Sequence, residues 1–404
     1  MEITNQSDVR VTRQQLYSVA FVILELSRLF FGSTYIGDLL GDNVVSLLSD
    51  GLLMVAMAIL LFTAAYSRLT WKRLFLFMFC CVLFGLSMLK SHATNLMVGF
   101  LFVFFADAIT DKKKFARLII GVFIGIIMVS AALSLSGLMG SKVTQRASNA
   151  AMRNSLGFNH PNHLGMMMFV VISVIFYIRS MRGRSGQLGK YIICGVLCLA
   201  TYLVTNTFSF LAITLLMMMA SFAYDVLVNT RHKLPRKQAK RFIRIGLLIF
   251  VAIIGAIVAY FWKNPYLLKG ALKTLRMRFT LSQKYIKAYG IKPFGSHIAL
   301  GEKVALPGFK PGYSFLDSGY VRIFVESGFF VGVLMMFAIV RIVWNLIRHG
   351  QWQVLIIVLC ILLYFFNEQK MLTVSYNPFW LLLWGALFTD KSPMARVRAY
   401  LHQR

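Results

Sequence analysis

The chain has 404 residues, of which 58% are hydrophobic and only 14% are charged. A soluble domain usually carries about 25% charged residues, so this composition excludes an ordinary soluble protein. The formal net charge is +29, but the basic residues lie in short segments between apolar runs. That distribution is typical of membrane topology signals and contacts with lipid headgroups, and it excludes nucleic-acid binding. We expect a protein embedded in a lipid bilayer.

The apolar residues form blocks of roughly 17–25 residues, the length of a membrane-spanning helix. We predict an all-α, polytopic membrane protein with about 12 transmembrane helices, arranged as a single integral membrane domain over residues 1–404. Several blocks are short or contain charges, which leaves eleven spans as the alternative. The predicted spans are 15–34, 44–66, 73–89, 94–110, 116–138, 163–180, 190–205, 208–228, 243–262, 319–341, 351–367 and 377–389.

The positions of Lys and Arg predict the orientation of these spans. The basic loops alternate with loops such as "GDLLGDN", "KSHAT" and "TNTF", which carry few basic residues. The basic loops and both termini should therefore be cytoplasmic, in a multi-pass protein of the cell membrane. Among charged residues within spans, we expect Glu25 and Arg28 to pair, and Asp107 and Asp225 to reach water near the cytoplasmic surface.

A large segment, residues 263–318, falls on the extracytoplasmic side. It holds ten Lys and Arg residues against only two carboxylates, Glu302 and Asp317. Residues 264–290 show apolar side chains near helical spacing and a basic opposite face, which predicts one or two amphipathic helices at the membrane surface. The rest of the loop is rich in Gly and Pro and should be ordered but irregular. A basic outer segment suits an anionic ligand.

The stretch "RNSLGFNHPNHLG", residues 153–165, gathers costly polar groups between two apolar runs. Pro161 suits the first turn of a helix, and Asn159 could be its N-cap. The helix N-terminus would then face outward, where its N–H groups and dipole favour an anion such as phosphate. Arg153, His160 and Asn162 could add contacts to the same anion. The alternative is a capped loop with a structural Asn and an exposed His.

The stretch "SFLDSGYVRIFVESGFF" offers a second set of polar residues at the end of the large loop. Asp317 faces outward among basic groups and is a candidate general base, although an ordinary helix N-cap is an equal alternative. Arg322 and Glu326 lie four residues apart, so they can neutralise each other on one helical face.

Four further residues are candidates on the outer side. Arg276 and Arg278 point about 200° apart on a helix, so only one of them should face a given ligand. His297 is a second candidate base, and Glu368 lies in a late outer loop that could close over the same site. The chain carries no nucleotide-binding, metalloprotease or dinucleotide motif. We expect neither a metal nor a cofactor.

Four stretches together resemble one family. "RNSLGFNHPNHLG" resembles the Arg-x(3)-Gly-Phe-x-His-Pro-Asn-x-x-Gly stretch of membrane polysaccharide polymerases and O-antigen ligases, and is especially similar to Wzy-type polymerases of bacterial exopolysaccharide and capsule. "RMRFTLSQKYIKAYGIKPFGSHI", "LDSGYVRIFVESGFFVGVL" and "YFFNEQKMLTVSYNPFWLLL" resemble later motifs of that family, in the same order, over roughly residues 140–390. One departure is "TNTFSF", where the family often has a Ser-Arg pair. Lys263 or Lys269 could replace that arginine.

The resemblance implies a glycosyltransferase that joins oligosaccharide repeat units carried on undecaprenyl diphosphate, without a metal or a nucleotide sugar. A flippase and a chain-length regulator are the partners it suggests. By motif match, Arg153, His160, Asn162 and Arg278 would contact the diphosphate or the donor, with His160 also a candidate catalytic group, and Asp317 would be the base. O-antigen ligase is the alternative within the family, although ligases tend to carry His in place of this Asp. A flippase for lipid-linked sugars is the alternative outside it.

Overall fold

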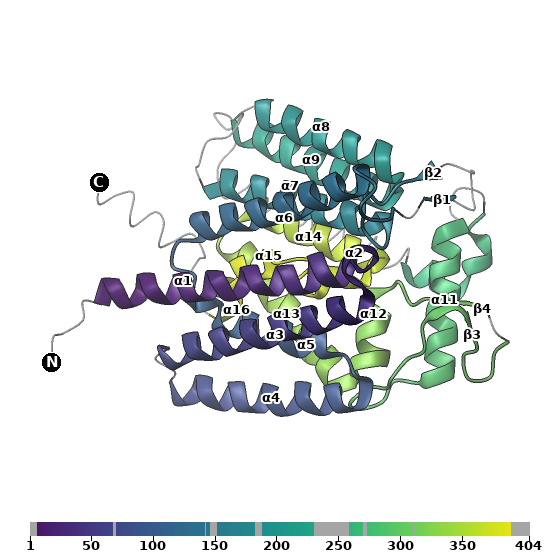
Figure 1. The fold of residues 1–404 in the computed structure, drawn as a ribbon, viewed down its shortest axis with the longest axis horizontal. Coiled ribbons are helices and arrows are strands. Elements are labelled where there is room, and N and C mark those ends of the chain that lie inside the picture. The colour runs from purple at the N-terminus through teal and green to yellow at the C-terminus, as the bar shows by residue number, and fades with distance from the viewer. Residues whose placement is uncertain are drawn as a thin grey trace. The chain divides into compact units, whose positions relative to one another are not determined.

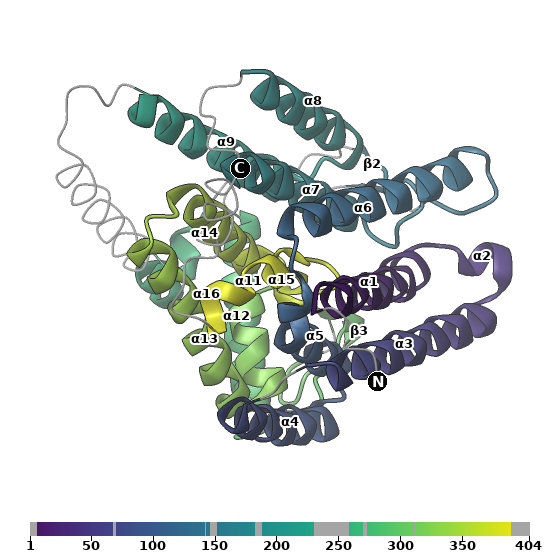
Figure 2. The same cartoon turned by 90° about the vertical axis from the view of Figure 1, so that its left-hand side faces the viewer.

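Helices make up nearly all of the regular structure in the computed structural model, which describes residues 6–67, 70–141, 143–145, 152–181, 188–229, 258–269, 273–310 and 312–388. The chain divides into two units, shown as ribbons in Figures 1 and 2. Unit 1 comprises Met1–Phe77, Val98–Phe222 and Met371–Arg404, and unit 2 comprises Met78–Met97 and Ala223–Lys370.

Unit 1 contains most of the long helices and one short strand pair. Its helical elements are α1 (Gln6–Glu25), η1 (Leu26–Phe31), α2 (Gly37–Leu40), α3 (Asp42–Ala65), α5 (Thr94–Phe105), η2 (Ala106–Ala108), α6 (Lys112–Leu135), α7 (Pro161–Met181), α8 (Leu188–Thr205), α9 (Phe208–Asn229), α15 (Phe379–Leu382) and α16 (Trp384–Phe388). The strands β1 (Thr144–Gln145) and β2 (Met152–Arg153) pair antiparallel. Helices α5 and α9 each continue for a few residues into the range of unit 2.

Helix α7 is the central helix of unit 1. It packs between α6 and α8, while α1 packs along α3 (Figure 2). In the most apolar 18-residue window of α7, 72% of the residues are buried, against 33% or less for the other candidate spans. The polar stretch 153–165 therefore leads directly into the best-packed helix of this unit, which holds its N-terminus in a fixed position.

The loops at the two ends of the unit 1 helices contact one another in the alternation that the charge pattern predicts. At one end, Gly140 donates its backbone N–H to Asp38 Oδ2 at 2.9 Å, and Asn154 donates to the carbonyl of Val204 at 3.0 Å. At the other end, Gln14 Oε1 accepts from the backbone N–H of Asp111 at 2.9 Å. The predicted outer loops of this unit thus share one end of its helices.

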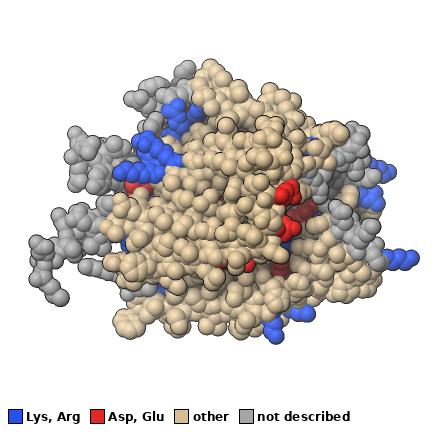
Figure 3. Space-filling view, in the orientation of Figure 1, with Lys and Arg blue, Asp and Glu red and all other residues tan. Residues whose placement is uncertain are grey.

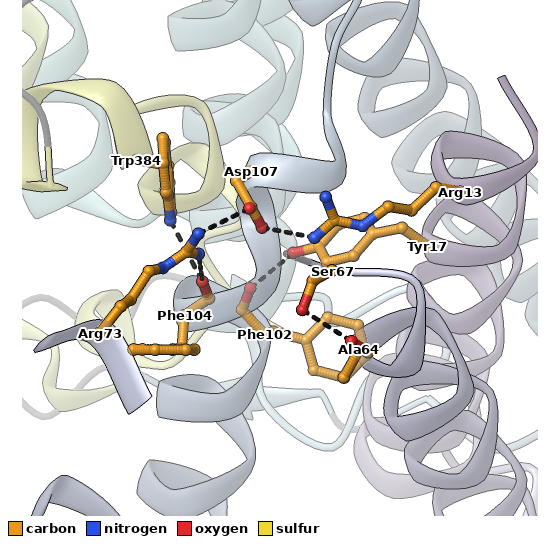
Figure 4. Close-up of polar contacts among 9 residues, drawn as sticks. All are labelled: Arg13, Tyr17, Ala64, Ser67, Arg73, Phe102, Phe104, Asp107 and Trp384. Carbon is orange, nitrogen blue, oxygen red and sulfur yellow. Dashed lines mark hydrogen bonds and ion pairs between the residues drawn. The ribbon is translucent and has the colours of Figure 1, made fainter. Parts of the chain in front are cut away.

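Asp107 holds three segments of unit 1 together (Figure 4). Its Oδ1 accepts from Arg13 Nη2 and its Oδ2 accepts from Arg73 Nη1, each at 2.8 Å. The guanidinium of Arg73 also lies over the rings of Phe104 and Trp384, at 5.1 and 5.0 Å from their centroids. We predicted that Asp107 reaches water, and this is wrong in part, because two arginines enclose the carboxylate and leave its side chain 15% exposed.

Unit 2 contains further helices and one β-hairpin. Its elements are α4 (Trp71–Ser91), which begins within the range of unit 1, η4 (Pro265–Leu267), α11 (Lys273–Tyr289), β3 (Gly301–Val304), β4 (Gly312–Ser314), α12 (Gly319–Arg322), η6 (Ile323–Ser327), α13 (Phe329–Arg348), α14 (Trp352–Asn367) and η7 (Gln369–Leu372). Strands β3 and β4 pair antiparallel with a register shift. Helix α11 confirms the amphipathic helix expected within residues 264–290, whereas the sequence did not predict the hairpin.

The large loop of unit 2 has its own hydrophobic core. Tyr285 from α11 packs with Ile298, Leu306, Leu316 and Val325, all of which are 4% exposed or less. The Tyr285 hydroxyl donates to the carbonyl of Ala299 at 2.8 Å, so the buried phenol keeps a hydrogen bond. Because this core joins α11, the hairpin region and η6, the loop is a packed structure that can hold side chains in fixed positions.

The structure supports a multi-pass membrane protein. Seven helices are long and apolar enough to cross a membrane among the described residues, namely α3, α4, α6, α7, α8, α9 and α13, and two shorter apolar helices accompany them. Large apolar side chains are exposed along these helices, as lipid contact requires. On the face drawn in Figure 3, uncharged residues cover most of the surface. Most of the predicted span 243–262 lies outside the described residues.

Three expectations about the spans are wrong. The predicted span 319–341 is broken at Gly328, whose φ is 92°, so that the long helix α13 begins at Phe329. Glu25 and Arg28 do not pair, and both Glu25 carboxylate oxygens are buried without a hydrogen-bond partner among the described residues. The π-helix η1 begins directly after Glu25. Its wider turn moves residue 28 away from the face that an α-helical spacing of three would give it. Asp225 is also buried, at 4% exposure.

Candidate functional site

Arg153 is the centre of a polar cluster at the N-terminus of α7 in unit 1. Its Nη2 donates to Asn162 Oδ1 at 2.6 Å and to Thr207 Oγ1 at 3.2 Å, and its Nε donates to the carbonyl of Thr205 at 3.0 Å. The sequence suggested that Arg153 and Asn162 could contact the same anion, and in the structure their side chains are hydrogen-bonded to each other. The loop between α8 and α9 lacks the arginine that the resembled family often has there, and its Thr205 carbonyl and Thr207 hydroxyl accept from Arg153.

His160 takes the role that we predicted for Asn159. Its Nδ1 accepts the backbone N–H of Asn162 at 3.1 Å, directly at the start of α7. Asn159 instead donates its own backbone N–H to the carbonyl of Ser33 at 2.9 Å. A neutral imidazole that accepts at Nδ1 carries its proton on Nε2. This contact ties the His160 ring to the first turn of α7.

The loop that carries these residues is fixed by the segment after η1. Tyr35 donates its backbone N–H to the carbonyl of Gly157 at 2.8 Å, and Thr34 forms an isolated β-bridge with Phe158. Gly157 has φ 85°, and a Cβ there would lie 2.8 Å from the carbonyl oxygen of Ser130. Only glycine fits both constraints, which explains its position before the Phe-x-His-Pro-Asn sequence.

Tyr376 and Ser33 belong to the same cluster, although the sequence did not single them out. The Ser33 and Tyr376 hydroxyls are hydrogen-bonded to each other, and the Tyr376 ring lies 5.4 Å from the ring of His163. The only signal in the sequence is that both residues lie in short polar segments between apolar runs. Hydrogen bonds between segments so distant in the chain cannot be deduced from spacing alone.

A second cluster lies in unit 2, around Arg278 and Asp317. Arg278 Nη1 lies 3.8 Å from Asp317 Oδ2, and the same nitrogen donates to the backbone carbonyl of Asn367 at the end of α14. The Arg278 side chain is 11% exposed and that of Asp317 is 33% exposed. The structure thus brings together the two residues that we predicted as a ligand contact and as a base, and leaves the carboxylate accessible.

Two opposing effects act on the pKa of Asp317. Burial raises the pKa of Asp317 above its ordinary value of 3.8, while the positive charges of Arg278 and Arg322 lower it and offset part of that effect. A carboxylate with a raised pKa is a better proton acceptor than an exposed one. The adjacent guanidinium can hold a negatively charged group of a ligand.

Arg322 and Glu326 form the ion pair that their spacing predicted. Arg322 Nε donates to Glu326 Oε2 at 2.5 Å, and Nη2 donates to Oε1 at 2.9 Å, which makes the pair bidentate. Glu326 therefore neutralises Arg322 one turn beyond Asp317. This leaves Arg278 as the cation that lies directly beside the Asp317 carboxylate.

The remaining candidates divide between this cluster and the surface. Arg276 is exposed on α11, so Arg278 is the arginine that faces the carboxylate, as the angular spacing predicted. Glu368 is 9% exposed and directly follows Asn367, whose carbonyl accepts from Arg278. His297 is exposed and its Nδ1 lies 3.4 Å from the carbonyl of Ser91, away from the residues that contact Asp317.

The two clusters offer complementary chemistry. The unit 1 cluster presents hydrogen-bond donors and a guanidinium at a helix N-terminus, which is suited to a phosphate. The unit 2 cluster presents an accessible carboxylate beside a guanidinium. Within the described ranges, no three His, Cys, Asp or Glu side chains are arranged to hold a metal ion.

Comparison of the chain with family models, with curated proteins and with solved structures gave no match.

Proposed function

We propose that the chain is a glycosyltransferase that polymerises undecaprenyl-diphosphate-linked oligosaccharide repeat units into a cell-surface polysaccharide or exopolysaccharide. The observation that carries this proposal is the pairing of Arg278 with Asp317 at 3.8 Å in unit 2. A polymerase of this type needs a base for an acceptor hydroxyl and positive charge for a diphosphate leaving group. The four motif stretches of the Wzy-type polymerases, in order, support the same class.

The proposed reaction is a single displacement. The acceptor hydroxyl attacks the anomeric carbon of the donor sugar, the bond from that carbon to the diphosphate oxygen breaks, and undecaprenyl diphosphate leaves with the electron pair. The hydroxyl proton passes to Asp317. Arg278 stabilises negative charge that develops on the leaving group, as preorganised cations do.

The unit 1 cluster, taken by itself, is suited to hold a diphosphate group in this proposal. Arg153 is held by Asn162 and Thr207, which fixes the plane of its guanidinium. His160 contributes by capping the start of α7, since its Nδ1 accepts from Asn162. These residues bind and orient charge but do not accept the acceptor proton.

A substitution of Asp317 tests the proposal with a matched control. Membranes that contain the full-length Asp317→Asn variant should accumulate single repeat units on the lipid carrier and no long polymer. Asp42→Asn removes an exposed carboxylate at the start of α3 and should leave polymer length unchanged. Long polymer in the Asp317→Asn variant would contradict the assignment of the base.

A flippase for lipid-linked oligosaccharide is the second candidate, and Glu25 is the observation that favours it. This carboxyl group is fully buried at the start of the π-helix η1, and transporters place such ionisable groups within spans. If the chain is a flippase, Glu25→Gln should abolish translocation of the lipid-linked unit. Normal translocation in that variant, with polymerisation lost in Asp317→Asn, would favour the polymerase.

A further inference from the structure

An open hollow of about 490 Å³ lies in unit 2, lined by Lys90 at the end of α4 and by residues 289 and 292–297, which precede α13 in the chain. Its polar lining comes from Lys90, Tyr289, Lys292, Ser296 and His297, and among the described residues no carboxylate lines it. The hollow does not include Arg278 or Asp317, so the proposed reaction leaves its residues without a role.

Backbone contacts between two segments hold the wall of the hollow together. Ser296 donates its backbone N–H to the carbonyl of Glu326 at 3.1 Å, and Phe329 donates to the carbonyl of Lys292 at 2.9 Å. A Cβ on Gly295 would lie 1.8 Å from the Glu326 carbonyl oxygen, so this close approach requires glycine. Lys292 and Ser296 are thereby fixed beside the start of α13.

The charged groups of the lining are all basic. Lys90 and Lys292 line the hollow and are exposed. Their ammonium groups favour an anion.

The surroundings of the hollow are apolar on the side of the helices. Phe329 and Phe330 at the start of α13 are 50% and 46% exposed, and Leu89 at the end of α4 is 70% exposed. The Phe330 ring contacts the ring of Phe294, which lines the hollow, at a centroid distance of 5.5 Å. A ligand with a charged head and an apolar tail would match both surfaces.

We propose that this hollow binds the phosphate headgroup of an anionic membrane lipid. The phosphate lies between Lys90 and Lys292, while the acyl chains lie along the exposed apolar residues of α4 and α13. This inference is independent of the proposed glycosyl transfer, because it requires only that the two helices end at a membrane surface.

Lipid retention by the purified full-length chain tests the proposal, measured by native mass spectrometry with equal additions of phosphatidylglycerol and phosphatidylcholine. Wild type should retain phosphatidylglycerol in preference. Lys90→Gln with Lys292→Gln should weaken that retention about thirtyfold, since two basic residues near an anionic lipid contribute on the order of 1 kcal/mol each. The matched control, Lys287→Gln with Lys310→Gln, removes the same charge from exposed positions outside the hollow and should change it little.

Equal retention of the two lipids by wild type, or equal losses in the two double variants, would overturn the proposal. Chemical acetylation of wild type gives a measurement that does not depend on how the variants fold. Phosphatidylglycerol vesicles should protect Lys90 and Lys292 but not Lys287, whereas phosphatidylcholine vesicles should protect none of them. Equal protection by inorganic phosphate alone would overturn the lipid assignment in favour of a soluble phosphate ligand.

Discussion

Arg278 and Asp317 lie on different elements of the large loop and face each other at 3.8 Å. Arg278 is anchored by the carbonyl of Asn367 at the end of α14, so its position depends on a third segment. The carboxylate keeps a third of its side chain accessible. This arrangement places a proton acceptor next to a fixed positive charge.

Removal of the Arg278 charge should nearly abolish polymer formation. We expect Arg278→Gln to lower the rate of polymerisation roughly a hundredfold, the cost of losing one preorganised charge-stabilising group. Arg278→Lys should recover little, because an ammonium is a compact, strongly hydrated point charge without the bidentate donors of a guanidinium. The measurement is polymer length and yield in membranes of known protein content. Lys287→Gln, on the exposed face of the same helix, is the control.

The pH dependence of activity should report the raised pKa of Asp317. Because burial raises this pKa above 3.8, Asp317 becomes protonated at a higher pH than an exposed aspartate does. As the pH is lowered, activity should therefore decline with a midpoint above pH 3.8. Arg322→Gln removes a positive charge that lowers the pKa, so its acid limb should move to higher pH. An acid limb that is the same in wild type and Arg322→Gln would contradict the electrostatic account.

Asp317→Asn should raise thermal stability while it abolishes turnover. The folded pKa lies above the unfolded one, so the folded state favours the neutral carboxyl. The stability that the neutral carboxyl contributes to wild type is fully present below the pKa of Asp317 in the unfolded state. It is lost as the pH rises through the pKa of Asp317 in the folded state. The stability gain of Asp317→Asn over wild type should therefore grow with pH. Melting temperatures across a pH series measure it, and a gain that shrinks with rising pH would be the opposite result.

The orientation of Arg153 should depend on Thr207. Thr207→Val keeps the shape of the side chain but removes the hydroxyl that accepts from Arg153. We expect a loss in polymerisation rate of about fivefold, which corresponds to the roughly 1 kcal/mol of one hydrogen bond. Arg153→Gln should lose far more activity. Initial rates of repeat-unit consumption compare the variants, and an equal loss in both would argue against a merely orienting role for Thr207.

Asp107 should stabilise unit 1 without a part in the reaction. Asp107→Asn leaves the guanidinium groups of Arg13 and Arg73 without their common carboxylate, which is 15% exposed. We expect a loss of about 1–3 kcal/mol in stability, seen as a lower melting temperature in detergent. Polymer made by the folded fraction should keep its normal length. Loss of activity in fully folded protein would show that this clamp has a further role.

Local patterns predicted much of the fold. Apolar block length predicted most of the long helices of both units, because each such block must satisfy its own backbone hydrogen bonds in the membrane. The spacing of Arg322 and Glu326 predicted their ion pair, since both lie within one helical turn. The break at Gly328 was not predicted, because a positive φ and the close approach to Gly295 depend on tertiary contacts.

The candidate site was predictable in its residue types and not in its hydrogen bonds. Asp317 and Arg278 stood out as charged groups in an outer basic loop, and Arg153 and His160 stood out in an apolar chain. The sequence could not reveal that Asn367 fixes Arg278 through a backbone carbonyl, or that His160 caps α7. Both contacts depend on where distant segments meet, which no periodicity encodes.

The most direct test of the central claim is a reconstituted reaction. Purified full-length protein in vesicles is supplied with undecaprenyl-diphosphate-linked repeat units, and the products are resolved by length on a gel. The account predicts a ladder of polymer and released undecaprenyl diphosphate from wild type, and only single repeat units from Asp317→Asn. Absence of a ladder from folded wild-type protein, or an equal ladder from Asp317→Asn, would contradict it.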